Sequence, residues 1–166
     1  QPGTLGRLLE LISKQKTMAV LVGNLAVINP DGSLQHMNKP AHMSLPRLLA
    51  DMCEWPYNPS AYFYPKKIHD SIGYFPVHEH YAMDYDFILK VALAKIPFQY
   101  FNEHWGNFRL LPEAKTGTDQ AANTSYHRAE ALRAAAIARL GILEKCQVYL
   151  YIGFWKVRNK LLSIAR

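Results

Sequence analysis

The sequence has few of the features that mark disulfide-bonded, secreted or membrane-spanning proteins. Its 166 residues include two cysteines. These two, Cys53 and Cys146, match no metal-binding or redox spacing, so we expect free thiols in a reducing compartment. No apolar run approaches the roughly 18 to 20 residues that cross a bilayer, and no secretory signal is visible. Internal repeats and low-complexity tracts are also lacking. These absences favour a globular domain that is stabilised by an ordinary hydrophobic core.

The chain does contain many apolar residues and an uneven excess of positive charge. Hydrophobic residues make up 49% of the sequence, which is enough for a core of normal size, and the net charge is +6. From Asp119 onward there are eight Lys or Arg and three Asp or Glu, so nearly all the excess lies in the last third. A basic, aromatic tail favours an anionic surface, such as phospholipid or nucleic acid, as a partner.

Short strands alternate with helices along the chain, and this pattern predicts an α/β fold. A turn is expected at residues 29–32, and Gly73 is expected to close a helical turn. The expected helices cover residues 4–16, 45–53, 65–72, 85–94, 124–140 and 144–165, and the expected strands cover 18–28, 61–64 and 98–101. We expect a loop or hairpin return over residues 33–44 and a loop over residues 102–117.

Residues 58–90 are the most informative stretch. An aromatic segment ends in the pair Lys66-Lys67, a short amphipathic piece leads to Gly73, and an extended segment then brings Asp84 to the start of a helix. This order resembles the acceptor side of a family 2 glycosyltransferase of the GT-A fold. The resemblance implies that Asp84 is the catalytic base that removes a proton from a sugar hydroxyl. A helix N-terminus favours the anionic form of a carboxylate, which suits that role.

Other residues become candidate substrate contacts through the same resemblance. Phe108-Arg109 and then Lys115-Thr116 resemble a segment that closes over the nucleotide diphosphate, so Arg109 and Lys115 are candidate phosphate contacts. Trp105 and Tyr62 are candidates because sugar rings stack on aromatic faces, although a core position is the commoner role of such residues. Asp86 is a further candidate, which we interpret as mainly structural.

The resemblance covers about residues 1–118, and only the second half of a catalytic domain. In the family, the aspartate motif that holds the metal precedes a segment like the one that begins at Gln1. We therefore expect that motif and the nucleotide-binding half upstream of Gln1, and an inactive chain when it is alone. The family implies Mg²⁺ or Mn²⁺, but Leu111 stands where a histidine often occurs, which puts metal dependence in question. The expected architecture is a partial GT-A domain over residues 1–118 and a helical, basic tail over residues 119–166.

The implied reaction is inverting transfer of a sugar from a nucleotide-sugar to a saccharide or lipid-linked saccharide, in surface polysaccharide or glycolipid synthesis. The tail has an aromatic, apolar run at 148–155, followed by Lys156, Arg158 and Lys160. Such a sequence is typical of a helix that lies on an anionic membrane surface. The expected location is therefore cytoplasmic, at the inner face of the cell membrane.

Other interpretations are open from the sequence. Asp84 also suits a helix N-cap, and His78 and His80 with Asp84 and Asp86 have the composition of a zinc site in a hydrolase. A noncatalytic carbohydrate- or membrane-surface-binding module is a further alternative. The basic tail is also compatible with a nucleic-acid binder, but its aromatic face favours lipid, so no nucleic-acid partner is predicted.

Overall fold

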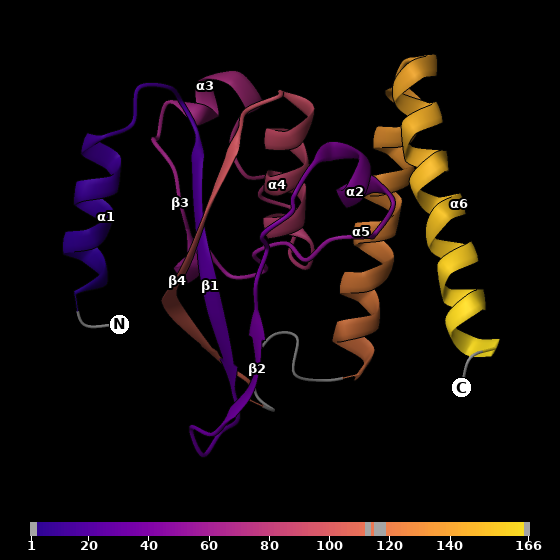
Figure 1. The fold of residues 1–166 in the computed structure, drawn as a ribbon. Coiled ribbons are helices and arrows are strands. Elements are labelled where there is room, and N and C mark those ends of the chain that lie inside the picture. Colours follow the sequence, from indigo (N-terminus) through magenta and orange to yellow (C-terminus); the bar gives the residue numbers. More distant parts are fainter. Residues whose placement is uncertain (1–2, 112–113, 115–118, 165–166) are drawn as a thin grey trace.

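The computed structural model describes residues 3–111, 114 and 119–164. It is a mixed α/β structure in which a four-stranded sheet lies between helices (Figure 1). The strands are β1 (Val20–Ile28), β2 (Leu34–Asn38), β3 (Tyr62–Phe63) and β4 (Phe98–Arg109). The helices are α1 (Thr4–Ser13), α2 (Leu45–Leu49), α3 (Ile68–Ile72), α4 (Met83–Leu93), α5 (Asp119–Arg139) and α6 (Ile142–Ile164), and η1 (Pro59–Ala61) is a 3-10 turn. The predicted α/β class is confirmed.

Strand β1 organises the sheet, because all the other strands pair with it. All nine of its residues are buried, as its nearly continuous apolar sequence predicts. Strand β2 pairs antiparallel with its second half, and β3 pairs antiparallel with its first half. Strand β4 runs parallel to β1 along nearly its whole length. Of the two alternatives expected over residues 33–44, a loop or a hairpin return, the hairpin return is present as β2.

Strand β4 is longer than the sequence indicated. A strand was expected over residues 98–101 and a loop after it, but the strand continues to Arg109. The loop prediction was wrong for residues 102–109, because the polar, glycine-containing sequence there has no strand pattern of its own. Its parallel pairing with residues Asn24 to Ile28 of β1, far away in the sequence, is what makes it a strand.

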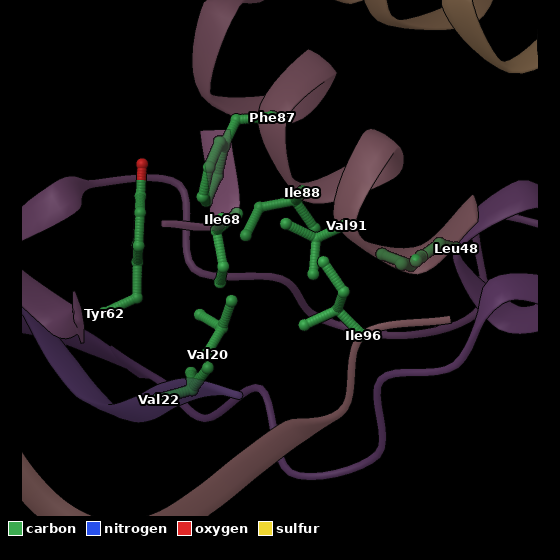
Figure 2. Close-up of a cluster of buried hydrophobic side chains, with 10 residues drawn as sticks. Val20, Val22, Leu48, Tyr62, Ile68, Phe87, Ile88, Val91 and Ile96 are labelled. Carbon is green, nitrogen blue, oxygen red and sulfur yellow. The ribbon is translucent and has the colours of Figure 1, made fainter. Parts of the chain in front are cut away.

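The two faces of the sheet carry separate cores. Figure 1 shows α1 on one side of the sheet and α2, α4, α5 and α6 on the other. On the first side, Leu8 and Leu11 of α1 pack with Leu21 and Trp105. On the second side, residues of β1 and β3 pack against α4 and α2, in a cluster that includes Val22, Tyr62, Phe87 and Ile88 (Figure 2). Side chains in the core beneath α1 therefore lie on the side of the sheet away from Asp84.

Helices α5 and α6 pack outside α4 and α2. A third cluster joins them, and its buried members are Leu49, Tyr85, Leu89, Ala136, Leu140 and Val148. The expected break at Gly141 separates the two helices. Arg133 of α5 is buried and forms an ion pair with Asp51, at 2.5 Å from Nη1 to Oδ1. The first part of the tail is thus held firmly against the α/β layer.

Candidate functional site

Asp84 lies in the first turn of α4, and it is not the N-cap. The helix begins at Met83, so Ala82 is the N-cap and Asp84 is the second helical residue. The carboxylate of Glu79 accepts hydrogen bonds from the backbone N–H groups of Tyr81 and Ala82, at 2.9 and 3.0 Å. The alternative in which Asp84 caps the helix is therefore wrong. Its half-buried side chain lies beside the positive end of α4, where an ionised carboxylate is favoured.

A buried tyrosine holds the Asp84 carboxylate. The hydroxyl of Tyr62, which comes from β3, donates a hydrogen bond to Oδ1 of Asp84 at 3.0 Å. The ring of Tyr62 lies nearly parallel to those of Tyr64 and Phe87, with centroids 6.1 and 5.7 Å away, and these two rings are 4.5 Å from each other. Figure 2 shows this ring at the edge of the core with its hydroxyl directed away from Val22. The structure thus brings together two predicted site residues that are 22 positions apart in the sequence.

Burial raises the pKa of Tyr62 well above its ordinary value, and the nearby Asp84 carboxylate adds to the effect. The phenol therefore stays protonated at physiological pH and remains a hydrogen-bond donor. A hydrogen bond from a neutral hydroxyl to an ionised carboxylate is among the stronger ones in proteins. Tyr62 is suited to hold the Asp84 carboxylate in position, which differs from the direct sugar contact expected of it.

Asp84 lines a pocket of about 530 Å³ whose walls include Trp, Tyr and Phe side chains. Trp55 and Tyr57 form one wall, and their rings meet edge to face at 5.9 Å. Tyr85 packs edge-on against Trp55 at 5.1 Å, and Phe108 packs edge-on against Tyr57 at 6.4 Å. A pocket of this size holds a small ligand, and aromatic walls with a single carboxylate suit a sugar ring that presents both an apolar face and hydroxyls.

Helix α5 closes another side of the pocket with small side chains. Ala122, Ser125 and Ala129 face into it. The hydroxyl of Ser125 donates a hydrogen bond to the backbone carbonyl of Tyr81 at 2.9 Å, which ties α5 to the segment ahead of α4. Sequence reasoning missed these residues, because an alanine-rich helix has no chemical signature. The motif that contains Phe108 predicts a contact only for its neighbour Arg109.

The other predicted substrate contacts lie elsewhere. Trp105 is 3% exposed and packs in the α1 core, on the opposite side of the sheet from Asp84. Asp86 is buried and forms an ion pair with Lys90, at 2.6 Å from Nζ to Oδ2, in keeping with a structural role. Arg109 is exposed at the end of β4, where its guanidinium donates to the carbonyl oxygen of Pro30 at 2.7 Å. Lys115 lies outside the described residues.

The zinc-site alternative finds no support in the geometry. Within residues 3–111, 114 and 119–164, no three His, Cys, Asp or Glu side chains are placed to hold a metal ion. His78 and His80 are both exposed, and only His80 lines the pocket. Asp86 is engaged with Lys90. These residues therefore do not fit a resident divalent cation, and the chemistry of the pocket centres on the carboxylate of Asp84.

No family model, no curated protein and no solved structure matches the chain.

Proposed function

We propose that this chain is the acceptor side of an inverting glycosyltransferase with a partial GT-A fold. The observation that carries the proposal is the placement of Asp84. Its carboxylate is held by Tyr62 at the start of α4, and it lines an aromatic pocket large enough for a sugar. The order of motifs around it, which resembles family 2 glycosyltransferases, supports the same interpretation.

In the proposed reaction, Asp84 accepts the proton of an acceptor hydroxyl as the hydroxyl oxygen attacks the anomeric carbon of the donor sugar. The new glycosidic bond forms as the bond to the nucleotide diphosphate breaks, and the diphosphate leaves with that electron pair. A single displacement inverts the anomeric configuration. Tyr62 keeps the carboxylate oriented, while Trp55 and Tyr57 stack against the acceptor ring.

The described residues contain few groups that could bind the donor nucleotide-sugar. Arg109 is turned to the carbonyl oxygen of Pro30, and no metal-binding group is present in the described part of the chain. The resemblance implies that the nucleotide-binding half lies outside residues 1–166, so turnover requires the complete enzyme. The chain's own share is then to bind the acceptor and to remove its proton.

The test is Asp84→Asn in the complete enzyme. Asparagine keeps the shape of the side chain and an oxygen that accepts from Tyr62, so the fold should be unchanged. Turnover should fall by about 10²- to 10⁴-fold, the usual contribution of a positioned base, while the affinity for the nucleotide-sugar stays the same. The matched control is Asp70→Asn, the same chemical change at an exposed carboxylate in α3, which should leave turnover unchanged.

Two results would count against the proposal. Near-normal turnover of Asp84→Asn would refute the role of Asp84 as base. If an acceptor saccharide binds the wild-type protein and Asp84→Asn equally, and neither protein turns over, the result would support the noncatalytic carbohydrate-binding module instead.

A further inference from the structure

Helix α6 has two apolar faces, and only one of them packs on the protein. Its inner face carries Val148, which is 1% exposed, and Tyr151, which lies under the guanidinium of Arg47 at 5.8 Å. The opposite face carries five large apolar side chains that are between 59% and 79% exposed. We call these five the outer stripe, and they are Leu143, Leu150, Phe154, Val157 and Leu161.

The spacing of the outer stripe shows that it is one continuous surface. Its members follow one another at intervals of seven, four, three and four residues, which keeps them on one side of a helix. From Leu143 to Leu161 the stripe runs about 27 Å along the helix axis. Figure 1 shows α6 at the outer edge of the molecule, with α5 and α2 on its inner side. A scattered exposed leucine needs no explanation, but a contiguous apolar stripe indicates a binding surface.

The neighbouring helix provides a comparison within the same molecule. Helix α5 is nearly as long and also lies on the outside, yet Tyr126 is the only large apolar side chain exposed among its described residues. Exposure at the edge of the molecule therefore does not by itself produce such a stripe. Of these two tail helices, only α6 carries such a stripe among its described residues.

Basic side chains lie on both sides of the outer stripe. At 100° per residue, Lys156 and Lys160 fall on one side of it and Arg158 falls on the other. The helix carries four basic residues and one acidic residue. A second copy of this chain docked through the same face would bring these like charges together, which costs free energy. An anionic lipid surface would meet both the apolar stripe and its basic flanks.

We infer that the outer stripe docks α6 into the interface of a bilayer that contains anionic phospholipid. The helix lies flat, with the stripe among the acyl chains and with Lys156, Arg158 and Lys160 at the level of the phosphates. No helix in the described residues is both long and apolar enough to cross a membrane.

The inner face of the docked helix, opposite the outer stripe, lies near the Asp84 pocket. Trp155, at the edge of the inner face of α6, lines a second hollow of about 350 Å³ together with Trp55 and Tyr57. Those two aromatic residues also line the pocket of Asp84. An acceptor that is anchored in the same bilayer would reach the base past these rings, so the acceptor class is a lipid-linked saccharide. This last step rests on the proposed function, whereas the docking itself does not.

Vesicle sedimentation of the 166-residue chain tests the docking without any measure of activity. The chain should pellet with vesicles of phosphatidylcholine and phosphatidylglycerol, should pellet weakly with phosphatidylcholine alone, and should be released by high salt. The double variant Leu150→Gln/Phe154→Gln should weaken binding by at least about tenfold, because it removes buried apolar contacts with lipid. Lys156→Gln should weaken it by about fivefold, the usual effect of one basic residue near an anionic surface.

The matched control is Leu9→Gln, which removes a leucine of similar exposure from the outer face of α1 and should leave vesicle binding unchanged. Circular dichroism of each variant should show that the exposed substitutions leave the fold intact. Equal pelleting of the wild-type chain and the double variant would overturn the inference. Failure of the wild-type chain to pellet with anionic vesicles would also overturn it. A lipid-free dimer in sedimentation velocity that the double variant abolishes would also overturn it and would identify a second copy as the occupant.

Discussion

Gly23→Ala tests whether Trp105 is a buried core residue, as in the structure, or a surface on which a sugar ring stacks. Gly23 lies in the middle of β1, directly beneath the indole of Trp105. A Cβ added there would stand 2.3 Å from Cδ2 of Trp105 and 2.6 Å from Cγ and from Cε3. Carbon atoms in contact are normally about 3.5 to 4.0 Å apart. The ring would therefore have to move by more than about 1 Å, and the change is a severe overpacking.

The surroundings of Trp105 leave the ring little room to move. Phe101 stacks on it at 5.6 Å, Phe63 meets it edge-on at 5.8 Å, and Leu8 and Leu11 of α1 cover it. Overpacking of a buried site costs about 1 to 3 kcal/mol, and this rigid, enclosed ring puts the cost at the upper end, about 3 kcal/mol. For a chain of this length that corresponds to a fall in Tm of about 6 to 12 °C.

The assay is thermal and urea unfolding followed by circular dichroism, with Gly6→Ala as the control. Gly6 is an exposed residue of α1, and a Cβ added there meets nothing within 4 Å. Alanine in a helix is favoured over glycine by about 0.5 to 1 kcal/mol, so Gly6→Ala should raise stability where Gly23→Ala lowers it. Equal stability of Gly23→Ala and the wild-type protein would mean that Trp105 does not cover Gly23, and its assignment to the α1 core would fail.

Three further predictions follow from other contacts. Tyr62→Phe should lower the free energy of unfolding in urea by about 1 to 2 kcal/mol, because it removes the hydrogen bond to Asp84 while keeping the ring; an unchanged value would show that the bond contributes nothing. Burial raises the pKa of the Cys53 thiol to about 11, so at pH 8 only about one thiol in a thousand is ionised. Iodoacetamide should therefore label exposed Cys146 much faster, and Cys53 should gain about tenfold in rate per pH unit up to its pKa. Calorimetry of this chain with UDP- or GDP-sugars and Mn²⁺ should show no binding; micromolar affinity would contradict the placement of the donor site outside these residues.

The local pattern of the sequence was sufficient to predict most helices and the central strand. The nearly continuous apolar run of β1 predicted a strand that is buried on both faces. The turn at residues 29–32 then placed β2 beside it. Helix α4 was also predictable, since its apolar residues recur at helical spacing. The placement of Asp84 near the start of that helix followed from the same pattern. These features depend on neighbours in the sequence, which periodicity and turn residues report directly.

The other features of the site depend on tertiary contacts. Residues 102–109 form a strand because β1 pairs with them, and nothing in their own composition favours that state. The same pairing places Trp105 against α1, on the side of the sheet away from Asp84. The hydrogen bond from Tyr62 to Asp84 and the wall that α5 adds to the pocket join segments that are distant in the sequence. Residue types alone carry no information about such pairs, because which face of the sheet a side chain occupies is decided by the register of the strands.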